Sequence, residues 1–432
     1  MTNVIDEFFY CVTKAREEKD GHLLANLLVF AQHDEATLRL RDELALFEDL
    51  NLSGECNKRF VSWKGFSLLI SSYLEFLRDV DFGDIRQAFD LIVKIVNQMA
   101  SAFSHVEAAW LIPAVKKLSA IGVNLAFLCD KSSNDPKSES VNSMSRVVFR
   151  IFNNVLSDRQ SLSLSKKGAV FHIANLLFRM YFALGQVRLC QTLHSNIASA
   201  DVEFSSFSRA DRVTYRYYLG RHYLFQNQFH RSRKHLYYAF NNCLSQTRNK
   251  RLIFIYLATC SIILGIFPSL ESLRDFDVTP IFLPIMQSIK FGDHSRLETH
   301  LNAKETFNWF IRHGVYLTFK NRSQLLISRS LFRRTFLLTY NSTSKTTFVA
   351  CSDLLKAYQW NNQNNTITLD DVECICVALI DQALVEGYIM HSRRYLVLKR
   401  ATNHGFRPIS SVLPDGSGHD YDDEDDKGSY PD

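Results

Sequence analysis

The stretch that decides the fold is residues 214–267, which read TYRYYLGRHYLFQNQFHRSRKHLYYAFNNCLSQTRNKRLIFIYLATCSIILGIF. Two small residues, Gly220 and Ser232, stand at the spacing of a close crossing between two helices. Leu219 and Ala239 belong to the same spacing pattern, and the large residues Tyr223, Phe229 and Leu236 fill the grooves beside the crossing. We therefore predict two packed helices with the small residues at their contact.

This spacing is typical of a tetratricopeptide-like (TPR-like) helical hairpin, a unit that cannot bury its apolar face without neighbours. A second unit is expected around a turn at Gly185, from the residues Leu177, Tyr181, Val187 and Cys190. The apolar run Leu252–Phe267 then predicts a fully buried helix that ends at Pro268. Together these patterns predict a mainly α protein, built as a right-handed helical-repeat solenoid.

The same region is rich in cations, and Asp211 is the single acid near them. A basic helical hairpin suits a polyanion or an acidic partner segment. A solvated face that keeps the solenoid soluble is the alternative for any one residue, but for the set we favour binding. The predicted partner-binding residues are Arg216, Arg221, Arg231, Arg233, Lys234, Lys250 and Arg251.

Composition supports a helical protein. The 432 residues suggest two or three structural units, and 16 Gly with 8 Pro argue against a loop-rich β protein. The nine cysteines are scattered and form no CxxC pair, which fits reduced thiols of the cytosol or nucleus, with Cys374 and Cys376 as core residues. The N-terminus has no apolar segment of a signal peptide, and the longest apolar run is shorter than the roughly 20 residues of a membrane span.

Four parts are expected along the chain. Residues 1–130 form N-terminal helical repeats, and 146–345 form the second helical-repeat part, in which Pro280 and Pro284 should limit helix. The polar residues 130–145 between them predict a surface loop or linker. Residues 409–432 predict an acidic disordered tail.

Residues 346–408 have the pattern of a winged helix. A short helix is expected at Ser352–Trp360, and a second begins with Thr368 as its N-cap. Two short apolar segments, YIM and YLVL, then predict a β-hairpin joined at His391–Arg394. Two helices followed by a hairpin of this length are typical of the winged-helix fold.

Cations gather near this module. No Asp or Glu occurs between Glu386 and Asp415, or from Thr306 to Ser352. A hairpin tip with adjacent arginines places guanidinium groups where phosphates can reach them. We predict sequence-independent contact with a nucleic-acid backbone, and give a purely protein-binding wing equal weight. The predicted nucleic-acid-binding residues are His391, Arg393, Arg394, Lys399, Arg400, Arg333, Arg334 and Lys345, with His404 and Arg407 on the same wing and Tyr340, Tyr388 and Tyr395 available for base stacking.

The motifs of common enzymes are missing from the sequence. It contains no Gly-rich phosphate loop, HExxH, GxSxG or carboxylate pair in an acid–base setting. His222, His230 and His235 lie close in sequence, but the acids and cysteines that would complete a metal site are absent there. We therefore expect no catalytic site, no metal and no cofactor.

A helical-repeat stack that runs into a winged helix resembles the PCI domain. More specifically, four motifs resemble Thp-type mRNA-export proteins and their relatives, the signalosome-subunit-twelve proteins. These motifs are Asp158–Cys190, Tyr215–Cys243, Asn249–Leu257 and Leu369–Arg400. The resemblance is close over Phe149–Pro408 and loose over the N-terminal helices.

The resemblance implies a non-catalytic scaffold of a nuclear complex that couples transcription to mRNA export. The implied location is the nucleus, with the cytoplasm as an additional alternative. The implied partners are a large Sac-type helical scaffold, a small acidic Dss/Sem-type protein, and RNA or DNA bound on the winged helix. The other branch of the family implies a signalosome-type or splicing-associated subunit that makes only protein contacts. No motif in the chain separates the two branches.

Overall fold

The structure is a computed structural model that describes residues 4–30, 34–46, 51–133, 135–160, 165–200, 202–244, 248–340, 347–362, 366–400 and 404–412. Two compact units make up the chain, Met1–Tyr218 and Leu219–Asp432. The predicted site residue Lys345 and the predicted acidic tail from residue 413 onward lie outside the described residues.

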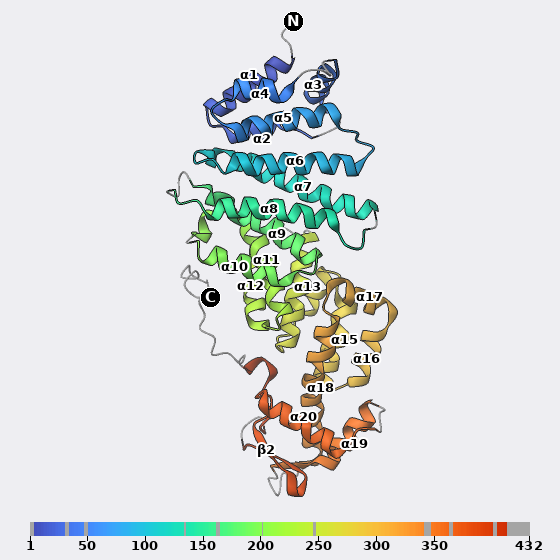
Figure 1. Cartoon of the computed structure of the whole chain (residues 1–432). Helices are drawn as coiled ribbons and strands as arrows, with labels where there is room; N and C mark the ends of the chain where they lie inside the picture. The colour runs from blue at the N-terminus through green and yellow to red at the C-terminus, as the bar shows by residue number, and fades with distance from the viewer. Residues whose placement is uncertain are drawn as a thin grey trace. The chain divides into compact units, whose positions relative to one another are not determined.

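The N-terminal unit consists of helices that lie side by side in successive layers (Figure 1). Its helices are α1 (Val4–Glu17), α2 (Gly21–Leu27), α3 (Glu35–Leu46), α4 (Leu52–Arg59), α5 (Lys64–Asp79), α6 (Ile85–Phe103), α7 (Ile112–Ser133), α8 (Glu139–Leu156), α9 (Val170–Ala183), α10 (Val187–Ala198) and the first part of α11 (Arg209–Phe225). Short 3-10 helices lie at Ala108–Leu111, Lys166–Ala169 and Phe204–Ser206.

Amphipathic spacing explains these helices. In α6 the buried residues Phe89, Ile92, Val96 and Met99 recur every three or four positions, so one stripe faces the neighbouring helices α5, α7 and α8. Asp84 caps the helix, because its carboxylate accepts hydrogen bonds from two backbone amides of the first turn.

One stretch of the described residues, Ala108–Ser133, is long and apolar enough by composition to cross a membrane. It contains α7, which contacts α6, α8 and α9 within the N-terminal unit. A core helix of a helical stack passes the same compositional test.

The polar stretch 130–145 is not the loop or linker that we expected. Helix α7 continues to Ser133 and α8 already begins at Glu139, so a short turn joins them. The carboxylate of Asp130, which is 8% exposed, accepts hydrogen bonds of 3.0 Å from the backbone amides of Ser140 and Val141. The polar residues therefore end one helix and cap the next.

The C-terminal unit contains the end of α11, more helices and one small sheet. Its helices are α12 (Phe229–Asn242), α13 (Arg248–Ile263), α14 (Leu270–Asp275), α15 (Thr279–Phe291), α16 (His294–Asn302), α17 (Lys304–His313), α18 (Tyr316–Thr339), α19 (Cys351–Asn362) and α20 (Leu369–Asp381). Its strands are β1 (Phe348–Ala350), β2 (Gly387–Met390) and β3 (Tyr395–Leu398), with 3-10 turns at His391–Arg393 and Ile409–Ser411.

The helical crossing predicted at Gly220 and Ser232 is confirmed. The Ser232 hydroxyl donates a 2.6 Å hydrogen bond to the Gly220 carbonyl, and a Cβ on Gly220 would lie 2.4 Å from the Cγ of Leu236. The turn at Gly185 is also confirmed, with φ +68. Helix α13 is buried without interruption from Ile253 to Ile263, but it ends at Ile263 and not at Pro268.

The expectation that Pro284 limits helix is wrong. Pro284 lies inside α15, which runs from Thr279 to Phe291. The amide that a proline lacks would have bonded to the carbonyl of residue 280, at the exposed start of the helix, where water can satisfy it. Further along the chain, Gly314, whose φ is +70, ends α17 and separates it from α18.

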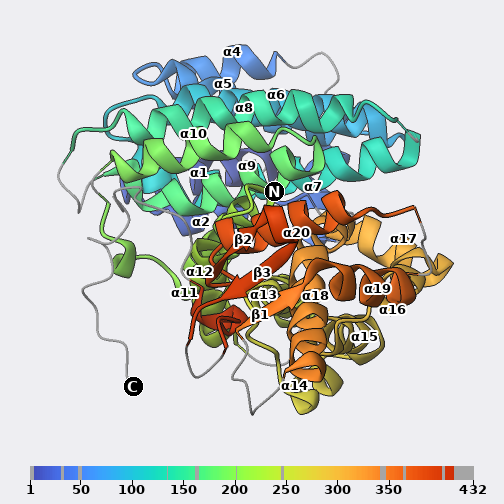
Figure 2. The same cartoon turned by 90° about the horizontal axis from the view of Figure 1, so that it is seen from below.

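Helix α18 joins the helical-repeat part of the C-terminal unit to the winged helix. It contacts α13, α15, α16 and α17 on the repeat side, and α19, α20 and β1 on the winged-helix side (Figure 2). The sheet has the antiparallel order β1-β3-β2, so the predicted hairpin is confirmed and β1 is an additional strand. The predicted cap is confirmed as well, because Thr368 and Asp371 form a reciprocal capping box.

Candidate nucleic-acid and partner interfaces

The predicted nucleic-acid-binding residues fall into two places on the winged helix. His391, Arg393 and Arg394 lie at the tip of the β2–β3 hairpin, whereas Lys399 and Arg400 lie at its base. Lys399 lies five residue steps of extended chain beyond Arg394, which corresponds to roughly 17 Å. The wing therefore presents two separate sets of cations.

Acids of α20 neutralise the hairpin tip. Arg394, which has a left-handed backbone with φ +56, pairs with Asp370 and, at 3.1 Å, with Glu373. The Asp370 hydrogen bond is the main reason that the pKa of Arg394 is raised. The Nδ1 atom of His391 lies 2.7 Å from the same Glu373 carboxylate, whose side chain is 10% exposed. Arg393 is exposed beside these pairs.

The sequence interpretation missed this neutralisation. Asp370 and Glu373 stand three residues apart and so share a face of α20, but they lie 18 or more residues before the arginines in sequence. Asp370 lies in the first turn of α20, where an acid is common beside an N-cap. Its contact with the wing depends on the tertiary fold.

The base of the hairpin keeps more of its positive charge. Glu386 is the acid there, and it lies 3.1 Å from the Nζ of Lys399 and 3.7 Å from the Nε of Arg407. Arg400 is exposed. Two cations thus share the Glu386 carboxylate, and a third, Arg400, adds its charge at the same end of the wing.

A hollow of about 320 Å³ opens beside these cations. Lys399, Arg400 and Thr347 line it together with three rings, which come from α18, from the residue that follows α18 and from the segment after β3. The rings belong to Phe336, Tyr340 and His404, and the centroid of His404 lies 5.5 Å from that of Phe336 and 5.1 Å from that of Tyr340.

The cations of α18 differ in what they contact. Arg329 is half-buried, and its Nη2 donates a 3.0 Å hydrogen bond to the carbonyl of Phe406. Arg334 donates a 2.6 Å hydrogen bond to the carbonyl of Phe291, on the repeat side. Arg333 is exposed, and its position between Arg329 and Phe336 places it on the helical stripe that leads to the hollow.

Most cations of the predicted partner-binding set lie over aromatic rings or contact backbone. Lys234 is exposed, whereas the other six are half-buried. Arg251 donates to the carbonyls of Phe276 and Asp277. The others have their charges 4.6–5.9 Å from ring centroids: Arg216 over Phe204, Arg221 over Tyr256, Arg231 over Tyr223, Arg233 over Tyr237 and Lys250 over Phe240. These contacts stabilise the helical crossing as well as charging its surface.

Asp211, the acid nearest to this set in sequence, has other partners. Its carboxylate lies 3.1 Å from His172 and 3.6 Å from Lys116, both in the N-terminal unit. The oxygens of Asp211 are thus engaged by His172 of α9, Lys116 of α7 and the hydroxyl of Ser208, which donates a 2.8 Å hydrogen bond.

The histidine and cysteine clusters do not form a site. His222 and His235 are buried among the helices, and Tyr223 stacks on His235 at 5.2 Å. Cys376 is buried, and burial raises the pKa of its thiol, but Cys374 is exposed and is not the core residue that we expected. Within the described ranges, no group of three or more His, Cys, Asp or Glu side chains is placed to hold a metal ion.

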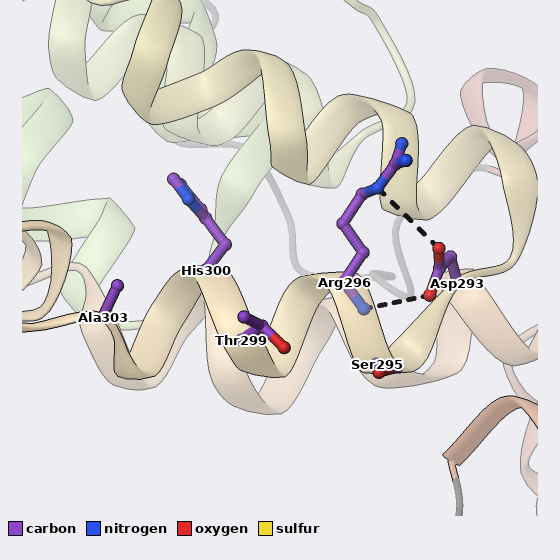
Figure 3. Close-up of a pocket in the computed structure, with 6 residues that line it drawn as sticks. All are labelled: Asp293, Ser295, Arg296, Thr299, His300 and Ala303. Carbon is purple, nitrogen blue, oxygen red and sulfur yellow. Dashed lines mark hydrogen bonds and ion pairs between the residues drawn. The ribbon is translucent and has the colours of Figure 1, made fainter.

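A second hollow, of about 510 Å³, lies along α16 (Figure 3). Its charged groups pair with each other: Asp293 caps the helix through the amide of Arg296 and lies 3.8 Å from the Arg296 guanidinium. His300 contacts the Ile281 carbonyl at 2.8 Å, and burial lowers its pKa. Its polar groups act in helix capping and packing.

These features define a class of protein: a stack of helix pairs whose last long helix carries a winged helix. No family model matches the chain. It is 35% identical to a PCI domain-containing protein of Schizosaccharomyces pombe, over 95% of this chain and 96% of the relative. It is 26% identical to PCI domain-containing protein 2 of Xenopus laevis, over 94% and 98% of the two chains. It is also 27% identical to a CSN12 homolog of Neurospora crassa, over 62% of each.

The chain therefore belongs to the PCI domain-containing proteins. The predicted fold class, a mainly α helical repeat followed by a winged helix, is confirmed by both the structure and these relatives.

Proposed function

We propose that this protein is a non-catalytic scaffold subunit of a nuclear complex that couples transcription to mRNA export. In this role it binds a large Sac-type helical scaffold and a small acidic Dss/Sem-type protein, and it contacts RNA or DNA through the winged helix. Its membership of the PCI domain-containing proteins supports the scaffold part of the proposal.

The observation that carries the nucleic-acid part is the set of exposed cations at the base of the wing. Lys399 and Arg400 line an aromatic hollow, and Arg333 is exposed on the stripe of α18 that leads to it. Glu386 lies 3.1 Å from the Nζ of Lys399. Exposed cations of this kind bind phosphates without reading sequence, and such binding weakens steeply with salt. The ion-paired hairpin tip is less available for this role.

Native affinity purification at moderate salt, with the bound chains identified by mass spectrometry, tests the proposal. We expect a large helical export scaffold and a small acidic protein to co-purify. RNA should be recovered with them and should be lost in the charge-reversal variant of Arg333, Lys399 and Arg400. Recovery of signalosome or splicing subunits without RNA would contradict the export role.

The second candidate is a signalosome-type subunit that makes only protein contacts. The relative named as a CSN12 homolog favours it. Its distinguishing result is an absence of RNA binding both alone and in the purified complex, with the basic base of the wing serving as a protein-docking surface.

A further inference from the structure

We propose that the hollow at the base of the wing binds one unpaired nucleotide of single-stranded nucleic acid, with the base against Tyr340 and His404 and the phosphate on Arg400 and Lys399. This inference rests on the proposed function, because it names the form of nucleic acid that the basic wing takes. It also adds a specific contact, since backbone charge alone does not distinguish a base from an abasic sugar.

The size of the hollow fits one nucleotide. Its volume of about 320 Å³ lies at the lower end of the range of about 300–1,000 Å³ typical of small-ligand pockets. An unpaired base can enter such a space, whereas a base inside a duplex is stacked on both faces and cannot. Single-stranded binders commonly combine cations that follow the backbone with rings on which bases stack.

The chemistry of the lining is divided in the way that a nucleotide requires. Phe336 is 1% exposed and forms an apolar floor, while Tyr340 and His404 are half-buried and so present part of their rings to solvent. The cations Lys399 and Arg400 are both exposed at the rim. An apolar surface below and cations at the edge match an aromatic base linked to a phosphate.

The backbone holds His404 in an uncommon conformation. Its φ is +51, and the following Gly405 has φ +76, with its Cα so close to the Glu386 carbonyl that a Cβ would lie 2.7 Å from that oxygen. A non-glycine residue in the left-handed region costs conformational energy that the surrounding structure has to offset. In this conformation the centroid of the imidazole lies 5.1 Å from that of the Tyr340 ring.

The test compares two probes of equal charge: a labelled short oligothymidine, and the same oligomer made of abasic sugars. The full-length protein should bind the intact strand about 5- to 100-fold more tightly than the abasic strand. Tyr340→Ala should remove most of this difference while leaving abasic binding unchanged. Tyr10→Ala, which changes a 69% exposed tyrosine of the N-terminal unit, is the matched control and should keep the difference.

One further variant and one competitor keep the test decisive. His404→Ala removes the second ring without touching α18, so it serves if Tyr340→Ala fails to fold, and circular dichroism checks each fold. An excess of thymidine monophosphate distinguishes a free nucleotide from a strand, because it should compete poorly if the backbone cations hold neighbouring phosphates too. Strong competition by it would assign the hollow to a free nucleotide and overturn the strand proposal.

The failures can be told apart. Equal, salt-sensitive binding of the intact and abasic strands would overturn the nucleotide pocket but leave the basic wing as a backbone-binding surface. Absence of binding to either strand would overturn both the pocket and nucleic-acid binding by the chain itself.

Discussion

The guanidinium of Arg329 donates a 3.0 Å hydrogen bond to the backbone carbonyl of Phe406. Arg329 belongs to α18 and Phe406 follows the wing, so this bond ties the helical repeat to the far end of the winged helix. The same guanidinium also donates to the carbonyl of Arg407. Burial, with the nearby charge of Arg333, lowers the pKa of Arg329 to about 10, which leaves it protonated at neutral pH.

Arg329→Met should destabilise the C-terminal unit by about 1.5–3 kcal/mol, because two carbonyls lose a charged donor. Urea unfolding measures this change in the free energy of unfolding. Arg333→Met, one helical turn away and exposed, is the control and should stay within about 0.5 kcal/mol of the wild type. Equal losses in the two variants would mean that the bonds to residues 406 and 407 contribute nothing particular.

Gly220→Ala should cost about 1–3 kcal/mol of unfolding free energy, because its Cβ would lie 2.4 Å from the Cγ of the fully buried Leu236. The higher helix propensity of alanine, worth about 1 kcal/mol, offsets only part of this overlap. Gly168→Ala is the matched control, since its Cβ would make an ordinary 3.4 Å contact with Ile112. If the Gly220 variant were as stable as that control, α11 and α12 could move apart to fit the added methyl group with no loss in the free energy of unfolding.

His294 should make stability depend on pH. It is 2% exposed, and burial lowers its pKa to about 4, although a hydrogen bond from its ring to Gln324 acts in the opposite direction. The unfolded chain binds the proton near pH 6.5 and the folded chain does not. The contribution of neutral His294 to the free energy of unfolding is therefore complete above pH 6.5. Roughly 3 kcal/mol of this free energy is lost as the pH falls toward 4.

Unfolding midpoints measured between pH 4 and 7 check this prediction. His294→Gln should flatten that pH profile, whereas His22→Gln, at an exposed position of the N-terminal unit, should leave it as in the wild type. A profile that the His294 variant leaves unchanged would assign the acid sensitivity to other groups.

The two arginines at the hairpin tip should behave differently. Arg394→Gln removes the partner of Asp370 and of the mostly buried Glu373, so the unfolding midpoint should fall. Arg393→Gln, at an exposed position, should leave the midpoint unchanged. A midpoint that falls equally in both variants, or in neither, would count against a structural role specific to Arg394.

Local patterns in the sequence predicted a large part of the fold. The Gly220–Ser232 crossing depends on residues only twelve positions apart, and the Thr368 cap depends on residues three apart. Features that depend on distant residues were missed. Strand β1 is three residues long and is defined only by its pairing with β3.

The candidate site was predicted less well than the fold, for the same reason. The sequence identified Lys399, Arg400, His404 and Tyr340 as candidates. Their grouping around Phe336 requires α18 to pack beside the wing. No acid lies near the hairpin tip in sequence, so the sequence predicted that the cations of the tip have no acidic partner. Glu373 reaches it from another helix, so its effect on His391 and Arg394 was not visible in the sequence.

The central claim is that the base of the wing binds nucleic acid, and the salt dependence of RNA binding tests it most directly. Fluorescence polarisation of a labelled short oligouridine is followed for the full-length protein and for the variant Arg333→Glu, Lys399→Glu, Arg400→Glu. We expect the variant to lose affinity at low salt and the slope of log K against log salt to become shallower by about 2. A control that reverses Lys64, Lys131 and Lys137, exposed residues of the N-terminal unit, makes the same change in net charge and should retain affinity. Equal low-salt affinity in the wild type and the wing variant would contradict the claim.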